Sequence, residues 1–188
     1  MRVFVALDIP PEVRAAVSAL VVKLRPACRN ARWVRIEGAH ITLKFIGEVP
    51  PETVTDIQAA LAAIHTAASI EMNFRGVGFF PNDRHPRVFW AGIEAGQELV
   101  EMAAAVEKSL EPLGIAREQR AFSPHLTLAR LDSPRGLDAL RAALASAGPL
   151  EFGRATLTEF HLYQSVLKPG GAEYTRLATY HLTKGVPT

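Results

Sequence analysis

The residues of this chain best suited to chemistry occur as two matching pairs. His40 and Thr42 lie two positions apart in the segment HITL, and His125 and Thr127 repeat that spacing in HLTL, 85 residues later (125 − 40). A neutral imidazole can take a proton from an attacking oxygen, and an imidazolium opposite it can give one to a leaving oxygen. Threonine hydroxyls can donate hydrogen bonds to non-bridging oxygens. Two such pairs facing one another would suit a phosphodiester, and the chemistry requires no metal.

A β-strand would place each pair on one face, because residues two apart point to the same side of a strand. The aliphatic residues of each segment would then lie on the opposite, buried face. A single strand histidine is more often a hydrogen-bonded structural residue. A second copy with the same flanking pattern favours the catalytic interpretation.

A second pair of segments has the same offset and indicates an internal repeat. RVFVAL at 2–7 recurs as RVFWAG at 87–92, again 85 positions later (87 − 2). Unrelated coincidences would not share one register. The pattern predicts strand, helix, a pair of strands, helix and strand, given twice.

The predicted elements are delimited by apolar periodicity and by proline and glycine. We expect helices after Pro10-Pro11 and Pro50-Pro51, over Leu99–Leu113 and after Ser133-Pro134, and further strands near 70–80, 150–163 and 174–183, the last of them after the turn Pro169-Gly170-Gly171. This order predicts an α+β fold in which residues 1–188 form one bilobal domain. Its two halves would be related by a pseudo-twofold axis, each with a mainly antiparallel sheet and helices on its outer face. The active-site cleft would lie between the halves.

The composition excludes several classes of protein. The 188 residues are 48% hydrophobic and 21% charged, which is typical of a globular domain and not of a disordered or fibrous chain. The formal net charge of +2 permits an anionic partner but argues against a purely electrostatic nucleic-acid binder. The single cysteine, Cys28, cannot form an internal disulfide. With no apolar run long enough for a signal peptide or membrane span, we expect a cytoplasmic, monomeric protein without membrane partners.

The remaining histidines do not predict a metal centre. His65, His85, His161 and His181 show no metal-ligand spacing and no clustering with carboxylates. No phosphate-cradling glycine motif is present either. We therefore expect neither a metal nor a cofactor.

The extended motifs resemble those of a known family. The segments HITLKFIGE at 40–48 and FSPHLTLAR at 122–130 resemble the tandem motifs of the two-histidine phosphoesterases, and most closely their bacterial RNA 2′,3′-cyclic phosphodiesterase branch, also called the 2′-5′ RNA ligase-like proteins. RVFVALDIP at 2–10 and the pattern SxLxPxGxxY at 165–174 are similar to further blocks of that family. The likeness thus spans nearly the whole chain.

The resemblance implies an activity and roles for the two histidines. RNA ends or nucleotides bearing a 2′,3′-cyclic phosphate would be hydrolysed to 2′-phosphates, with water attacking phosphorus and the 3′ oxygen leaving. It implies His40 as the proton donor and His125 as the proton acceptor, an assignment that the residues alone leave open. It also implies that the reverse use of this acid and base could join RNA ends through a 2′-5′ linkage.

Several residues near the motifs are candidate substrate contacts. Thr42 and Thr127 would bind the phosphate, and the resemblance favours Arg130 as a phosphate or nucleotide contact. Arg130 is five positions after His125, so it reaches the same face only if the strand ends or twists after Leu128. Lys44, four positions after His40, would share the face of that histidine or be an ordinary solvated lysine. Four further arginines could line the cleft or be solvated: Arg32, Arg35, Arg117 and Arg120.

Two other functions compete with this interpretation. The first is a catalytically silent module that binds RNA or nucleotides in the same groove. The second is a related two-histidine enzyme that acts on a cyclic phosphodiester outside RNA.

Overall fold

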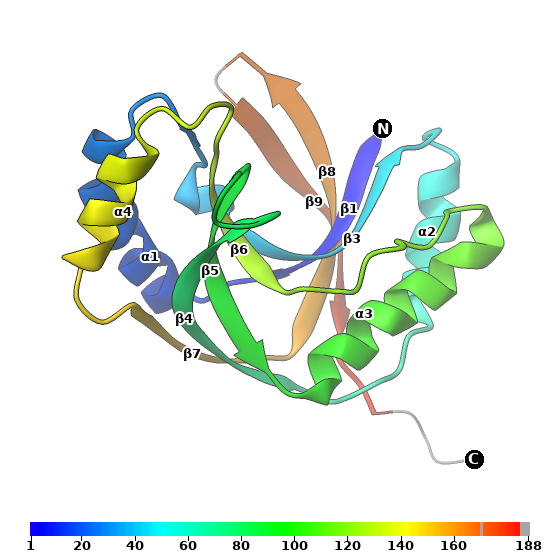
Figure 1. Ribbon diagram of the computed structural model, residues 1–188. Helices are drawn as coiled ribbons and strands as arrows, with labels where there is room; N and C mark the ends of the chain where they lie inside the picture. Colours follow the sequence, from blue (N-terminus) through cyan, green and yellow to red (C-terminus); the bar gives the residue numbers. More distant parts are fainter. Residues whose placement is uncertain (170, 185–188) are drawn as a thin grey trace.

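The computed structural model describes residues 1–169 and 171–184, which form two antiparallel β-sheets with helices packed against them (Figure 1). In chain order the elements are β1 (Arg2–Asp8), α1 (Pro11–Leu24), β2 (Arg32–Trp33), β3 (His40–Glu48), α2 (Thr53–Ala62), β4 (Ile70–Phe80), β5 (Val88–Ala95), α3 (Gln97–Leu110), β6 (His125–Arg130), α4 (Leu137–Ala145), β7 (Glu151–Leu157), β8 (Glu159–Lys168) and β9 (Gly171–His181). Short 3₁₀ turns follow α1 at Arg25–Ala27, precede β3 at Ile36–Gly38 and follow α3 at Glu111–Leu113.

The strands form one sheet in the order β3-β1-β8-β9 and a second in the order β2-β6-β5-β4-β7. All neighbouring strands in both sheets run antiparallel. The α+β class expected from the sequence is therefore confirmed.

The two halves of the chain exchange elements between the sheets. Strand β4, from the first half, pairs with β5 of the second half, and β8 of the second half pairs with β1 of the first. Only residues 81–87 connect β4 to β5, and strands joined so closely in sequence usually pair with one another. Each sheet therefore contains strands from both halves, so the expectation that each half would form a sheet of its own is wrong.

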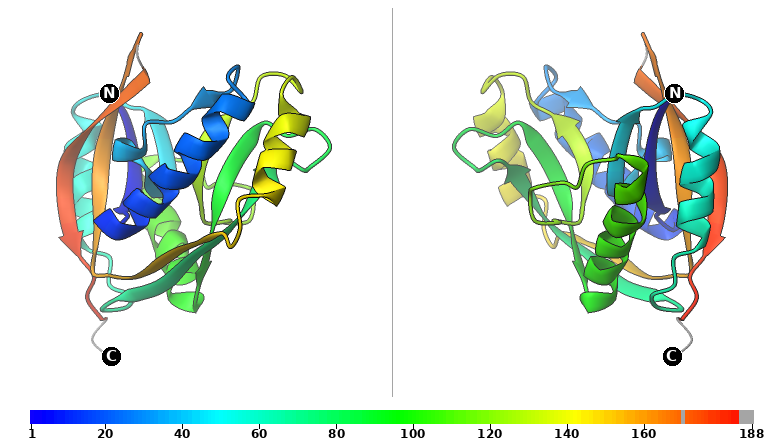
Figure 2. Two further views of the ribbon diagram at one scale, coloured as in Figure 1. Left: turned by 90° about the vertical axis from the view of Figure 1, so that its left-hand side faces the viewer. Right: turned by 90° about the vertical axis from the view of Figure 1, so that its right-hand side faces the viewer.

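The helices cross between the sheets in the same way. Helix α1 follows β1 of the first sheet but packs, beside α4, against β7 of the second (Figures 1 and 2). A Cβ atom added to Gly153 of β7 would lie 3.2 Å from Val13 of α1, which shows how closely they approach. Helix α3 follows β5 but packs beside α2 and against β3. Each sheet is thus covered by one helix from each half of the chain.

Several predicted boundaries differ from the structure, among them those of α3, which ends at Leu110, and of β9, which begins at Gly171. Helix α4 begins at Leu137, three residues after Pro134, because Gly136 precedes it in the left-handed conformation with φ of 81°. Ser133 does not cap the helix but accepts a hydrogen bond from Asn30. The expected strand over 150–163 is two strands, β7 and β8, which break at Thr158. Gly170, in the predicted turn before β9, lies outside the described residues.

The apolar faces of the sheets and helices form one buried core. Ile41 and Leu126, the residues between each histidine and its threonine, are both fully buried in it. These aliphatic side chains anchor the two motifs, so that the histidines lie on the opposite strand faces. No helix in the described part of the chain is long and apolar enough to cross a membrane.

Candidate active site

The first histidine motif begins strand β3, at the edge of the first sheet. His40 lies opposite Asp8 of β1, and Thr42 lies opposite Ala6. Residues paired across antiparallel strands share a face of the sheet. One face of this sheet therefore carries the imidazole, the hydroxyl and the carboxylate together.

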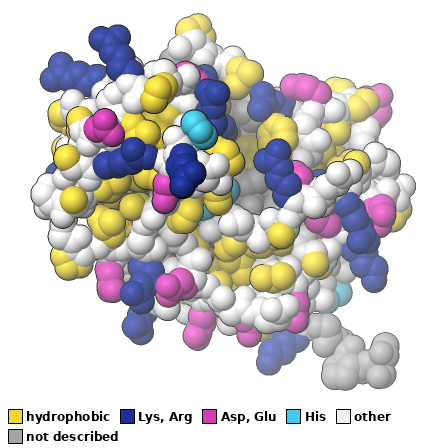
Figure 3. Space-filling model, in the orientation of Figure 1, with side chains coloured by type: hydrophobic (Ala, Val, Ile, Leu, Met, Phe, Trp, Pro, Cys, Tyr) yellow, Lys and Arg dark blue, Asp and Glu magenta, His cyan; other side chains and the backbone are white. Residues whose placement is uncertain are grey.

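The second motif begins strand β6, next to the short edge strand β2. His125 lies opposite Gly92 of β5, and Thr127 lies opposite Trp90. Strands β3 and β6 lie against one another where the sheets meet, with Cα atoms within 8 Å. In the space-filling view, lysine and arginine side chains border a recess in the middle of this side of the molecule, and a histidine is visible there (Figure 3).

Both motif strands contain a β-bulge at the same place. In β3, Thr42 pairs with Ala6 and Lys44 with Val5, so Leu43 is an extra residue. In β6, Thr127 pairs with Trp90 and Ala129 with Phe89, so Leu128 is extra in the same way. The first six residues of the two strands share one burial pattern, with positions two, four and five buried. This detailed match supports the internal repeat inferred from the sequence.

Each bulge reverses the alternation of the residues that follow it. Phe45 pairs with Phe4, and because Phe4 is on the same face as Ala6 and Asp8, Phe45 returns to the face of His40. Arg130 pairs with Val88 and returns to the face of His125 in the same manner. The bulge thus supplies the change of direction that the sequence analysis required for Arg130.

Arg130 and Phe45 are both accessible on these faces. The Arg130 side chain is exposed and has no ion-pair or hydrogen-bond partner among residues 1–169 and 171–184. Phe45 is 52% exposed, and the guanidinium of Arg2 lies 4.9 Å from the centre of its ring. An unpaired guanidinium can bind phosphate, and an exposed ring can stack on a base.

Lys44 does not share the face of His40, contrary to strict alternation, and it is not solvated. Its position in the bulge turns it away from the histidine, and it is 6% exposed. Its Nζ donates to Glu107 Oε2 at 2.8 Å and to the Ala116 carbonyl at 2.6 Å. Both interpretations of Lys44 offered by the sequence are therefore wrong.

The two histidines are oriented by equivalent hydrogen bonds. Nδ1 of His40 lies 2.8 Å from the Gly38 carbonyl oxygen, and Nδ1 of His125 lies 2.8 Å from that of Ser123. A carbonyl oxygen can only accept, so each Nδ1 carries the hydrogen. In the neutral ring Nε2 is then the basic nitrogen, and in the described residues neither Nε2 has a hydrogen-bond partner. Each Nε2 is therefore available to exchange a proton with a ligand.

The ring of His40 belongs to an aromatic cluster. It stacks on Phe4 at 4.6 Å between ring centres, and Tyr174 meets it edge-on at 5.1 Å. Burial lowers the pKa of His40 below its ordinary 6.5, while the Gly38 carbonyl and the Asp8 carboxylate act in the opposite direction. His125 has a single aromatic neighbour among the described residues, Phe80, whose ring lies edge-on at 5.0 Å.

A cavity of about 270 Å³ adjoins His40 and includes polar residues that the sequence analysis did not select. Asp8 accepts a hydrogen bond from the Tyr163 hydroxyl at 2.6 Å and forms an ion pair with Arg176. Tyr174 lies in the same lining, and its presence in the quoted pattern at 165–174 was the available signal. Asp8 and Arg176 come from distant strands, so no local spacing could have linked them.

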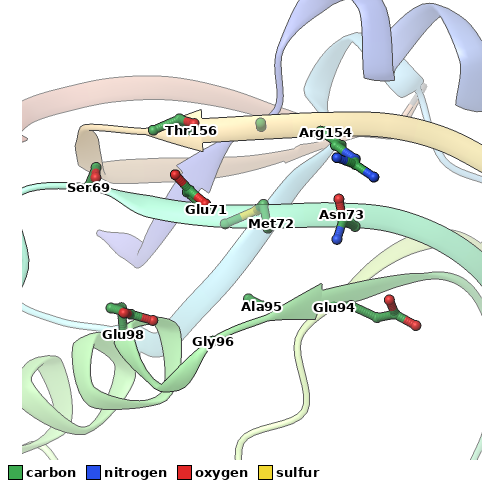
Figure 4. Close-up of a pocket in the computed structure, with 11 residues that line it drawn as sticks. Ser69, Glu71, Met72, Asn73, Glu94, Ala95, Gly96, Glu98, Arg154 and Thr156 are labelled. Atoms are coloured by element: carbon green, nitrogen blue, oxygen red, sulfur yellow. The ribbon is translucent and has the colours of Figure 1, made fainter.

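A larger cavity, about 930 Å³ in volume, contains neither motif histidine. It lies along β4, β5 and β7, where Glu71, Asn73 and Glu94 line it together with Arg154 (Figure 4). Its carboxylates would repel a phosphate, so its size does not make it the better candidate site.

The four other candidate arginines fall into two groups, according to whether an acidic side chain contacts them. Arg32 forms an ion pair with Asp132 at 2.8 Å, and Arg117 forms one with Glu111 at 2.7 Å. Arg35 and Arg120 form no side-chain ion pair within the described ranges. The neighbour of Arg130 across the sheet is Arg32, whose charge Asp132 balances.

Comparison with known proteins identifies the family. A model of the 2′-5′ RNA ligase superfamily matches residues 9–168. The chain belongs to the 2′-5′ RNA ligase superfamily. Among the relatives in this superfamily, the RNA 2′,3′-cyclic phosphodiesterase of Archaeoglobus fulgidus is 34% identical over 182 residues, covering 96% of this chain and 99% of the relative. The Thermus thermophilus protein of the same name is 38% identical over 192 residues, covering 97% and 90%.

Solved structures of similar proteins have the same fold. A crystal structure from Thermus thermophilus matches with a TM-score of 0.81 and 33% identity over 98% of this chain and 99% of that one. Escherichia coli LigT in complex with 3′-AMP matches with a TM-score of 0.79 and 26% identity over 97% and 98%. LigT has also been crystallised with phosphate, and that structure matches with a TM-score of 0.75 and 27% identity over the same shares of the two chains.

Proposed function

We propose that this protein is an RNA 2′,3′-cyclic phosphodiesterase that converts 2′,3′-cyclic phosphate ends to 2′-phosphates. The observation that carries the proposal is the matched pair of histidines, each with Nδ1 bonded to a backbone carbonyl and Nε2 left for a ligand. The relatives that bear this name support the same reaction. The complexes of LigT with 3′-AMP and with phosphate support a nucleotide as the ligand.

The reaction uses the two histidines as a base and an acid. Nε2 of neutral His125 takes a proton from water as the water oxygen bonds to phosphorus. Nε2–H of protonated His40 gives its proton to O3′ as the P–O3′ bond breaks. One bond forms, one breaks, and each histidine ends the turnover in the opposite protonation state, which solvent resets. An RNA 5′-hydroxyl in place of water would give a 2′-5′ linkage by the same steps.

The residues around the histidines bind the remaining parts of the substrate. The hydroxyls of Thr42 and Thr127 donate to the non-bridging phosphate oxygens, where negative charge resides throughout the reaction. Arg130 binds the phosphate or a neighbouring one. Phe45 stacks on a base next to the reacting end. The chain acts as a monomer in the cytoplasm, without a metal or cofactor.

One incubation tests the proposal. An RNA oligomer ending in a 2′,3′-cyclic phosphate is treated with the protein in the presence of EDTA, and the position of the product phosphate is assigned by NMR. The proposal expects a 2′-phosphate and full activity with the chelator. A 3′-phosphate product would mean that O2′, and not O3′, is the leaving oxygen. Loss of activity in EDTA would contradict metal-independent catalysis.

The same assay separates the competing functions. A silent binding module would retain the RNA but convert none of it. An enzyme for other cyclic diesters would convert a small non-nucleotide cyclic phosphate at a higher kcat/KM than either the RNA or a 2′,3′-cyclic mononucleotide. The proposed enzyme favours the nucleotide substrates.

A further inference from the structure

Lys44 is a buried cation that the reaction proposed above does not use. Its side chain is 6% exposed, and its partner Glu107 is 18% exposed. Lysine is almost never buried without a partner, and a buried ion pair often contributes no more stability than well-packed apolar residues would. Stability alone is therefore a weak explanation for this pair.

The bulge itself does not need a lysine. The position equivalent to Lys44 in the second bulge is Ala129, which is fully buried and makes the same type of pairing with β5. Both bulges return the next residue to the histidine face. The lysine must therefore contribute something beyond the local backbone geometry of β3.

The contacts of Lys44 connect three separate parts of the chain. Besides its ion pair with Glu107 of α3, Lys44 donates to the carbonyl of Ala116. Glu107 Oε2 also accepts a hydrogen bond from the backbone N–H of Glu118 at 3.3 Å. Residues 114–124 lead from the end of α3 and its 3₁₀ turn to β6 (Figure 1). The pair thus attaches the strand that begins with His40 to the segment that leads into His125.

We propose that Lys44 is a positioning residue that fixes the two histidine-bearing strands relative to one another. The inference depends on the two-histidine reaction proposed above, in which both imidazoles act on one phosphorus atom. Lys44 lies on the face of β3 opposite His40, so it does not touch the substrate. It acts by holding 116–118 against β3. A displacement of about 1 Å between reacting groups can lower a rate roughly 10²-fold.

The test separates positioning from stability by comparing a single and a double variant. Lys44→Met leaves the partly buried Glu107 without its cation, so both the melting temperature and kcat fall. In Lys44→Met/Glu107→Leu no buried charge is left, so the melting temperature recovers. The tie to 116–118 is still missing, so kcat on a 2′,3′-cyclic nucleotide stays at least about tenfold low while KM changes less.

Two further variants complete the design. Lys168→Met removes an exposed lysine that forms an ion pair with Glu173 at 2.6 Å, and it should change neither quantity. Glu107→Gln keeps an oxygen that can accept from both Lys44 and Glu118, so it should retain most of kcat and remains informative if the double variant does not fold.

The outcomes are distinct. A double variant with a restored melting temperature and wild-type kcat would overturn the proposal, since Lys44 would then be only a buried charge. Binding of 2′-AMP, measured by calorimetry on the same proteins, provides a readout that does not require turnover. It should weaken no more than KM rises in the double variant, and a loss of binding as large as the loss of kcat would also overturn the proposal, since Lys44 would then hold the binding site itself. Failure of the wild-type protein to turn over any cyclic phosphate would instead refute the proposed function.

Discussion

Phe45 and Arg130 occupy the same position in the two halves of the molecule. Each is the fifth residue after its histidine, and each returns to the histidine face because the strand carries one extra residue, Leu43 or Leu128. The two positions hold side chains of different chemistry, an exposed ring and an exposed guanidinium. The site is therefore symmetric in its acid and base groups and asymmetric in the groups beside them.

Replacing either motif histidine should abolish most of the turnover. A positioned general acid or base contributes roughly 10²–10⁴-fold, so His40→Ala and His125→Ala should each lower kcat by that order on a 2′,3′-cyclic nucleotide. His181→Ala is the matched control, since His181 is an exposed histidine whose ring lies 3.2 Å from Glu159. Wild-type rates in either motif variant would remove that histidine from the mechanism.

Arg130→Ala should weaken substrate binding. A hydrogen bond to a charged group contributes about 1.5–3 kcal/mol, which corresponds to roughly a 10- to 100-fold loss in kcat/KM. Arg130→Lys should recover part of this loss, because it keeps the charge but not the bidentate geometry. Arg141→Ala serves as the control, since Arg141 is on α4 and pairs with Asp138. Equal kinetics for the Arg130 and Arg141 variants would place Arg130 outside the site.

Phe45→Ala should affect nucleotides more than small cyclic phosphates. Stacking of a base on an aromatic side chain contributes about 1–3 kcal/mol, so KM should rise roughly tenfold for an RNA end. Phe45→Trp should preserve the wild-type KM. A small non-nucleotide cyclic phosphate has no base, and its kinetics should be the same in all three proteins. An RNA KM that is insensitive to Phe45→Ala would place the base elsewhere.

The pH dependence of the reaction should follow the environment of His40. Burial lowers the pKa of His40 below 6.5, so the protonated acid is lost as pH rises through that lowered value. The pH profile of kcat/KM reports ionisations of the free enzyme. The apparent pKa of its alkaline limb, where activity falls as pH rises, should therefore lie below the ordinary histidine pKa of about 6.5.

Two variants should move this limb in opposite directions. Phe4→Leu removes the ring stacked on His40, so the pKa should rise and the limb should move to higher pH. Asp8→Asn removes a carboxylate that raises the pKa, so the limb should move to lower pH. NMR titration of the His40 ring measures the same shifts directly. If the NMR pKa moves and the kinetic limb does not, His40 is not the proton donor.

The sequence was sufficient to predict the fold class and the strands that begin with the two histidine motifs, but not the faces of the residues that follow those motifs. Alternation assumes that every residue of a strand is paired, and a bulge adds one that is not. Nothing in LKF or LAR marks the extra leucine. That single residue is why strict alternation placed Lys44 on the wrong face.

The long-range partners could not be predicted for a different reason. A repeat shows which segments are equivalent but not whether a strand pairs within its own copy or with the other one. The pairing of β4 with β5 and the group formed by Asp8, Tyr163 and Arg176 both depend on that choice. Only the strand order of the folded sheets shows which pairing occurs.

The exchange of elements has a consequence for the integrity of the protein. Proteolytic nicking within residues 81–87 would cut the chain between β4 and β5 without separating the sheets. Each resulting fragment would still contribute strands to both, and the inter-strand hydrogen bonds would hold the fragments together. The two halves are therefore interleaved in both sheets, and only residues 81–87 join them covalently.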